Sequence, residues 1–220
     1  MRLNKWIAEH SAHSRRSADA LITAGRVTVN GNPATTGQQV EPTDSIAIDG
    51  APLSSRPLKT ATLLLHKPVG YVCSRKGQGA PTVYSLIPQQ YHHLDIAGRL
   101  DKDSSGLVVL TNDGQLLYEL THPSQEKLKK YHIQLNKPLS VEHEKLVSAQ
   151  GVKLEDGVSK LALTAASPDR TQWEVTMHEG RNRQIRRTFE AIGYRTTTLH
   201  RTSMGAFSVE GIDNGKTRLA

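Results

Sequence analysis

The chain has 220 residues, of which 36% are hydrophobic and 5% aromatic, enough for one medium domain or a small domain followed by a medium one. Lysine and arginine outnumber aspartate and glutamate 28 to 21, and the net charge of +7 makes a polyanion the first partner to consider, with a merely basic soluble protein as the equal alternative. One cysteine, Cys73, excludes an intramolecular disulfide, and no apolar run approaches the roughly 18 residues of a membrane span. We therefore expect a cytoplasmic protein without a membrane partner.

The first fifty residues predict two helices followed by short strands. Leu3, Ile7 and Ala8 recur at helical spacing. Ser14 can cap a second helix that Gly25 ends. The stretch RVTVNG then alternates and closes on Asn-Gly, a strong hairpin signal, and DSIAIDG alternates again.

Basic residues gather near the helix ends and the turn between them. Only Glu9 and Asp19 oppose them between residues 1 and 30. A solvated helical face is the plain interpretation, but clustering at one turn suits contact with phosphates. The candidate RNA-binding residues are Arg2, Lys5, Arg15, Arg16 and Arg26.

This N-terminal segment resembles a known RNA-binding module. The stretch RLNKWIAEHSAHSRRSADALITAGRVTVNG is similar to the alpha-L domain, named after a small-subunit ribosomal protein, and the pattern covers nearly all of the first fifty residues. The resemblance implies that two helices and the adjoining hairpin present basic residues to structured RNA.

Residues 51–61 form a proline- and serine-rich stretch that predicts a linker between domains 1–50 and 62–220. Beyond it, strands and helices do not alternate regularly, which favours an α+β fold with a mixed, mostly antiparallel sheet flanked by helices. The expected strands lie in TLLLHKPVGYVCS, GLVVLTNDG, KKYHIQLN and QWEVTMHEG, and the expected helices in QLLYELTHPS and RNRQIRRTFEAIGY.

The stretch GRLDKDSSGLVVLTNDG, residues 98–114, has three interpretations, of which the first is a calcium site. Asp101, Asp103, Ser105 and Gly106 match the opening of a calcium-binding loop. The twelfth position, however, holds Asn112 instead of a bidentate glutamate, and an apolar strand replaces the expected helix. The sequence thus argues against calcium, and the scattered histidines predict no other metal site.

The other interpretations are a structural turn and a carboxylate presented to a substrate. Ser104 and Gly106 suit a turn. Arg99 lies two residues before Asp101, and an arginine beside Asp101 would hold its carboxylate ionised at neutral pH. Four further arginines within seven residues predict a strong phosphate-binding field: Arg181, Arg183, Arg186 and Arg187.

The motif GRLDKDSSGL resembles the signature of the pseudouridine synthases that modify ribosomal RNA, in the branch with an alpha-L domain in front. HKPVGYVCS, KKYHIQL and EGRNRQIRR continue the resemblance in the expected order, from about Lys67 to Arg201. It implies that Asp101 is the essential aspartate, that Tyr131 packs on the uracil ring, and that Arg186 pairs with the catalytic carboxylate.

The same resemblance implies a substrate-binding set. Arg99 falls on the basic residue that helps hold the target nucleotide out of the helix, Ile185 on the pocket wall, and Arg183 beside it in the basic motif. Asp103 is interpreted as a loop stabiliser. No cofactor or metal is expected, because the reaction needs neither redox change nor group donor.

The implied function is isomerisation of a specific uridine in ribosomal RNA by base flipping and glycosidic bond exchange. Asp101 would act as a nucleophile at the sugar or as a base, and the sequence leaves both open. GRLDKDSSGL and RNRQIRR resemble members acting on large-subunit RNA somewhat more, with small-subunit and transfer RNA not excluded. We expect a monomer acting on naked RNA or an assembly intermediate; the alternative is a non-catalytic RNA-binding or ribosome-assembly protein.

Overall fold

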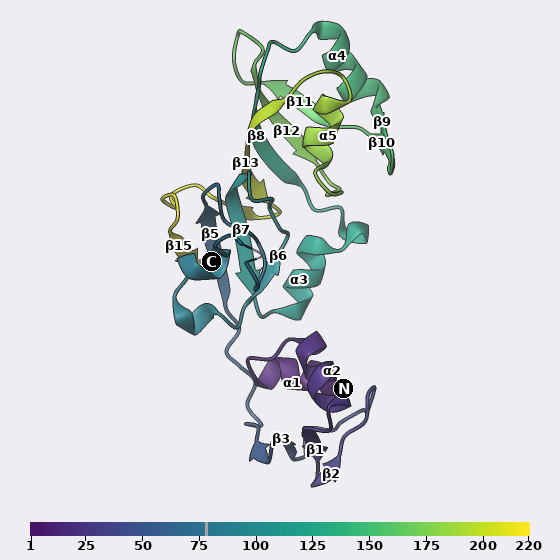
Figure 1. Ribbon diagram of the computed structural model, residues 1–220, viewed down its shortest axis with the longest axis vertical. Coiled ribbons are helices and arrows are strands. Elements are labelled where there is room, and N and C mark those ends of the chain that lie inside the picture. Colours follow the sequence, from purple (N-terminus) through teal and green to yellow (C-terminus); the bar gives the residue numbers. More distant parts are fainter. Residues whose placement is uncertain (78) are drawn as a thin grey trace. The chain divides into compact units, whose positions relative to one another are not determined.

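The computed structural model describes residues 1–77 and 79–220, which divide into two compact units, Met1–Ala61 and Thr62–Ala220 (Figure 1). The N-terminal unit packs two helices on a small sheet with the strand order β2-β1-β3-β4. Its elements are α1 (Leu3–His10), α2 (Arg15–Thr23), β1 (Val27–Val29), β2 (Asn32–Pro33), β3 (Ile46–Ile48) and β4 (Ala51–Pro52).

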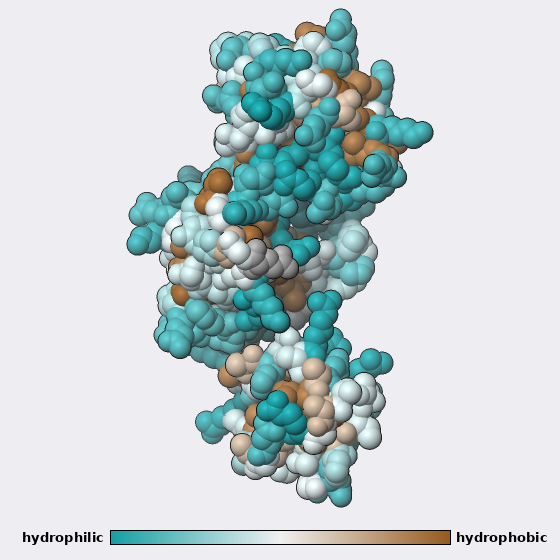
Figure 2. Space-filling view, viewed as in Figure 1, coloured by the Kyte–Doolittle hydropathy of each residue, from teal (hydrophilic) through white to brown (hydrophobic). Residues whose placement is uncertain are grey.

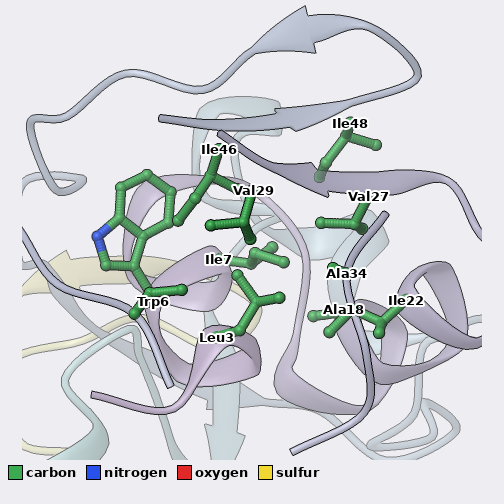
Figure 3. Close-up of a cluster of buried hydrophobic side chains, with 11 residues drawn as sticks. Leu3, Trp6, Ile7, Ala18, Ile22, Val27, Val29, Ala34, Ile46 and Ile48 are labelled. Atoms are coloured by element: carbon green, nitrogen blue, oxygen red, sulfur yellow. The ribbon is translucent and has the colours of Figure 1, made fainter. Parts of the chain in front are cut away.

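The apolar faces of both helices and both central strands form the core of this unit. Leu3 and Ile7 on α1, Ala18 on α2 and Val27 on β1 are at most 1% exposed and point toward one another in Figure 3. Each fully buried leucine, isoleucine or valine side chain stabilises the fold by about 1.5–3 kcal/mol. Ser14 caps α2, as predicted, by accepting a hydrogen bond from the backbone amide of Ser17 at 3.2 Å.

The predicted linker begins too early. Ala51 and Pro52 form β4, which pairs with Ala47 and Ile48 on β3, and Leu53 packs against the core of the N-terminal unit. Prolines are tolerated on such an edge strand, because its free side needs no amide donor. The proline- and serine-rich composition of residues 51–61 therefore did not reveal that the first two residues form a strand.

A nine-stranded sheet organises the C-terminal unit (Figure 1). The main path runs β11-β12-β8-β13-β7-β5-β15, while β6 pairs with β7 and β14 with β13. Within the described residues only the β13–β7 pair is parallel, so the sheet is mixed and mostly antiparallel, as predicted. The strands are β5 (Thr62–Lys67), β6 (Asp95–Ala97), β7 (Ser105–Thr111), β8 (Lys129–Leu135), β11 (Ala162–Ala165), β12 (Gln172–Met177), β13 (Thr196–Met204), β14 (Phe207–Ser208) and β15 (Thr217–Leu219).

Short helices and one separate hairpin complete this unit. Asp113 caps α3 (Gly114–Thr121) by accepting from the amides of Gln115 and Leu116. The remaining elements are α4 (Val141–Lys145), a π-helical turn (Leu146–Gln150), α5 (Gln184–Glu190), the hairpin β9 (Val152–Leu154) and β10 (Gly157–Ser159), and 3₁₀ turns at Val83–Leu86, Gln89–Tyr91 and Pro123–Gln125.

The centre of the sheet is rigid because β7 is buried on both faces. Leu107 to Leu110 are all completely buried, and Leu65 on β5 lies opposite Val108. Figure 2 shows hydrophilic side chains over most of the visible face of this unit. No helix among the described residues is long and apolar enough to cross a membrane.

Candidate active site

One row of side chains crosses the centre of the sheet. Its strand register aligns Val175 on β12, Tyr131 on β8, Arg201 on β13, Gly106 on β7 and Lys67 on β5. Because neighbours in register share a face of a sheet, Tyr131 and Arg201 lie side by side. The loop that carries Asp101 enters β7 at the same place.

Gly106 fixes the distance between β7 and β13. A Cβ atom at this position would lie 2.2 Å from the carbonyl oxygen of Arg201, and φ is +108°. No other residue fits, because the backbones meet too closely and the conformation excludes L side chains. Gly106 thus serves strand packing, and the predicted role in a turn is wrong.

Three hydrogen bonds to backbone carbonyls hold the Asp101 loop in place. The amide of Ser104 donates to the carbonyl of Asp101 at 3.1 Å, and Gly70 donates to the carbonyl of Lys102 at 2.8 Å. The ammonium of Lys67, fully buried, donates to the carbonyl of Ser104 at 2.5 Å. The Asp101 side chain, 36% exposed, therefore stands on a fixed backbone.

Two arginines bind the carboxylates of this loop, but not in the predicted pairing. Nη1 of Arg183 lies 3.3 Å from Oδ2 of Asp101, and its two terminal nitrogens donate to both oxygens of Asp103 at 3.1 Å. Nε of Arg186 lies 3.3 Å from Oδ2 of Asp103. The expected partner of Asp101, Arg186, thus contacts Asp103, and Arg183 takes its place.

Arg186 is also tied to the backbone on two sides. It donates to the carbonyl of Thr196 at 2.7 Å and to the carbonyl of Asp103 at 2.9 Å. Its side chain is only 11% exposed. Arg186 therefore joins α5, β13 and the Asp101 loop.

Asp103 is more than a loop stabiliser, because it anchors both arginines. Burial acts to raise the pKa of Asp103, but the hydrogen bond from Arg183 and the charges of Arg186 and Arg183 outweigh burial, so this pKa lies below its ordinary value. Both loop carboxylates already bind guanidinium groups, which speaks against calcium, and the described residues contain no cluster of three metal-ligating side chains.

The other two arginines of the basic cluster are used internally. Arg187 binds both oxygens of Asp156, and Arg181 binds the same carboxylate and Glu179. These pairs fasten the start of α5 to the β9–β10 hairpin. The predicted phosphate-binding field of four arginines is therefore largely neutralised.

The start of α5 aims Arg183 through an unusual backbone. Arg183 precedes the helix with a left-handed φ of 47°, which costs on the order of 1–3 kcal/mol for a residue other than glycine. The next residue, Gln184, is 3% exposed and binds Ser159 and Glu179. Gln184 was not predicted as a site residue from the sequence. Its polar side chain, among four arginines of a helical pattern, was the feature that could have indicated such a role.

A groove with a volume of about 1060 Å³ opens over this part of the sheet, and we call it the central groove. Tyr131 is 7% exposed on its floor and Ile185 5% exposed on its wall. The groove brings together all six predicted catalytic and substrate-binding residues: Arg99, Asp101, Tyr131, Arg183, Ile185 and Arg186.

Arg99 and the predicted RNA-binding residues of the N-terminal unit differ in whether an acidic side chain pairs with them. Arg99 is exposed at the groove, and within residues 1–77 and 79–220 its guanidinium forms no hydrogen bond or ion pair. Arg15 and Arg16 are exposed at the start of α2. Lys5 pairs loosely with Glu9 at 3.7 Å.

Arg26 is bound more firmly. Its Nε and Nη2 donate to the two carboxylate oxygens of Asp49 at 2.8 Å and 2.5 Å. Arg2, by contrast, is an exposed residue of the N-terminal unit.

Comparison with known proteins agrees with this architecture. A family model described as RNA pseudouridylate synthase matches residues 61–191, and a model of the S4 domain matches residues 1–46. The chain therefore belongs to the RNA pseudouridylate synthase family and carries an S4 domain at its N-terminus. It is an enzyme that isomerises uridine in RNA, and the non-catalytic alternative is wrong.

Relatives that match nearly the whole of this chain support the assignment. The chain is 35% identical to the dual-specificity RNA pseudouridine synthase RluF of Escherichia coli (strain K12) over 99% of this chain and 74% of that protein. It is 38% identical to the ribosomal large subunit pseudouridine synthase B of Salmonella typhi over 93% and 73%. A solved pseudouridylate synthase superposes with a TM-score of 0.71 at 30% identity, covering 100% of this chain and 96% of that one.

Proposed function

We propose that the enzyme converts a specific uridine of large-subunit ribosomal RNA to pseudouridine, with Asp101 as the catalytic carboxylate. The names of the relatives support ribosomal RNA as the substrate, since one is a ribosomal large subunit synthase. The dual-specificity relative keeps a second RNA class open as an alternative substrate. We further propose a cytoplasmic monomer that acts on naked RNA or on an assembly intermediate.

The observation that carries the proposal is that Asp101 and Tyr131 line the same central groove, with a guanidinium 3.3 Å from the carboxylate. A carboxylate, an aromatic face and a fixed cation are the groups that exchange of a glycosidic bond requires. They come from the β7 loop, β8 and the residue before α5, so the rigid sheet sets their spacing.

The reaction begins with removal of the uridine from its helix. The C1′ and C5 atoms become accessible only in an extruded nucleotide. Arg99, exposed and without an ion pair in the described chain, is placed to occupy the vacated stack and to contact a phosphate.

Asp101 then acts on the ribose. It either attacks C1′ or takes the C2′ proton; in both routes the C1′–N1 bond breaks and its electron pair stays with the base. Arg183 orients the carboxylate, Asp103 holds Arg183 in turn, and Arg186 binds Asp103.

The base then turns and forms a bond from C5 to C1′. In the first route this bond displaces Asp101 from C1′, and in the second route Asp101 returns the proton to C2′. Tyr131 and Ile185 supply the apolar surface against which the uracil ring stays in the groove. The C5 proton leaves and N1 gains one, so the sum of the steps is an isomerisation. Tyr131 or a water molecule accepts the C5 proton.

The proposed substrate is tested with transcripts tritiated at uracil C5, because only rearrangement at C5 releases the label. We expect release from large-subunit RNA and little from small-subunit or transfer RNA. Mapping the modified uridine in a strain without the enzyme identifies the position. Release from transfer RNA alone, with ribosomal RNA unmodified, would contradict the proposed substrate.

A further inference from the structure

Two basic side chains on the floor of the central groove have no role in the steps above. Lys129 lies two residues before Tyr131 on β8, so both project from the same face of the sheet. Arg201 is the direct register neighbour of Tyr131 on β13. Both side chains line the central groove.

Within the described chain neither cation has a carboxylate partner. The ammonium of Lys129 donates to the carbonyls of His178 at 2.8 Å and Lys127 at 3.3 Å. The guanidinium of Arg201, in a residue 1% exposed, donates to the carbonyls of Leu107 and Gly98. Carbonyl dipoles orient these groups but leave their full positive charge uncompensated.

The positive charges of Lys129 and Arg201 also repel each other. Burial lowers the pKa of Lys129, and the positive charge of Arg201 lowers it further. A fold that keeps two like charges together without a counter-ion stores unfavourable energy, which an anion in the groove would release. Lys67, the third buried cation of this region, does not line the groove and supports the Asp101 loop instead.

The reaction supplies an anion at this place. When the C1′–N1 bond breaks, the electron pair remains on uracil, whose negative charge spreads over N1, C5 and both exocyclic oxygens. We propose that Lys129 and Arg201 form a subsite for this uracil anion, the leaving group that exists between rupture of the C1′–N1 bond and formation of the C1′–C5 bond. The inference rests on the function proposed above.

The geometry suits a leaving group better than an RNA phosphate. A base stacked on Tyr131 presents its edge to the residues beside Tyr131 on the same face, and Lys129 and Arg201 are the two of these that line the central groove. Pre-oriented donors stabilise developing charge without reorganisation, and backbone carbonyls orient both Lys129 and Arg201. A phosphate contact would instead strengthen binding of every RNA.

Lys129→Met tests the subsite, with Lys129→Arg as the conservative variant. Lys130→Met is the matched control, because Lys130 is the next residue of β8, faces the other side and pairs with Glu174. Under single turnover with saturating enzyme, we expect Lys129→Met to slow pseudouridine formation about 100-fold. The dissociation constant for RNA and its salt dependence stay at wild-type values, and Lys129→Arg recovers most of the rate.

Arg201→Gln is the second arm and should slow the reaction by a similar factor. If its burial prevents folding, the Lys129 series decides alone. A Lys129→Met rate within threefold of wild type would overturn the subsite, as would weaker RNA binding with a lower salt slope, which identifies a phosphate contact. Failure of the wild-type enzyme to modify any ribosomal RNA would instead overturn the proposed substrate, and the subsite with it.

Discussion

Asp103 binds Arg183 and Arg186 beside Asp101, the proposed catalytic carboxylate. Without the charge of Asp103, Arg183 loses a two-point contact and Arg186 loses an ion pair. We expect Asp103→Asn to lower the single-turnover rate about 10- to 100-fold, because Arg183 no longer orients Asp101. Asp49→Asn, which breaks the exposed pair with Arg26, is the control, and wild-type turnover by Asp103→Asn would refute the anchoring role.

His200 makes the stability of the C-terminal unit depend on pH. Burial lowers its pKa, and His66 on β5 and His132 on β8 lower it further. Below about pH 6.5, His200 therefore binds a proton in the unfolded chain but not in the folded chain. The free energy of unfolding falls by about 1.4 kcal/mol for each unit by which the two pKa values differ. The loss continues as pH falls toward the folded-state pKa.

We expect His200→Gln to flatten this pH dependence below about pH 6.5, while the amide keeps a hydrogen bond to the hydroxyl of Ser105. Urea denaturation at several pH values measures the effect, and exposed His13→Gln is the control. An unchanged slope in His200→Gln would show that other groups carry the dependence.

Single residues were predicted unevenly for a physical reason. The family resemblance predicted Asp101 and Tyr131 for one site and Arg186 as the partner of Asp101, but in the structure Arg186 contacts Asp103 and Arg183 contacts Asp101. Two carboxylates two residues apart and four nearby arginines allow several pairings of similar energy. The left-handed backbone of Arg183 selects among them, and local sequence does not reveal it.

At the scale of elements, the contact between β7 and β13 is the joint of the C-terminal unit, since β13 pairs with β7 on one side and β8 on the other. We expect Gly106→Ala to separate these strands, because the new Cβ would lie 2.2 Å from a carbonyl oxygen and 2.5 Å from the amide nitrogen of Arg201.

The expected cost is about 3 kcal/mol or more in the free energy of unfolding, measured by urea denaturation. Gly114→Ala is the control, because the helix start there leaves open space for a Cβ. A Gly106→Ala variant of wild-type stability would contradict the close approach of the strands.

Hydrophobic periodicity predicted four helices and six strands but not the central strand β13. The predicted elements are α1, α2, α3, α5, β1, β3, β5, β7, β8 and β12. The sequence of β13, TTTLHRTSM, is polar, and its buried positions are Thr196, Leu199, Arg201 and Met204. Register shifts after Thr196 and after Arg201 break the alternation that identifies a strand. A buried polar strand with bulges is recognised only through its neighbours.

At the scale of the whole molecule, the net charge of +7 is divided between free and paired residues. Arg15 and Arg16 are exposed on α2, whereas Arg26 is held by Asp49. We expect Arg15→Ala with Arg16→Ala to weaken RNA binding and to lower its salt slope by about two.

Arg26→Ala should change the slope less, because Asp49 already satisfies that guanidinium. Binding titrations between low and high salt compare the variants. An unchanged slope in the double variant would mean that this surface of the S4 domain faces solvent in the complex.

The account as a whole depends on one carboxylate meeting the ribose of an extruded uridine. The most direct test is Asp101→Asn, an isosteric change, in single-turnover assays on ribosomal RNA with parallel measurement of RNA affinity. We expect no pseudouridine above background and a dissociation constant within about twofold of wild type, since Asp101 serves chemistry and not binding. Product formation near the wild-type rate would contradict the account.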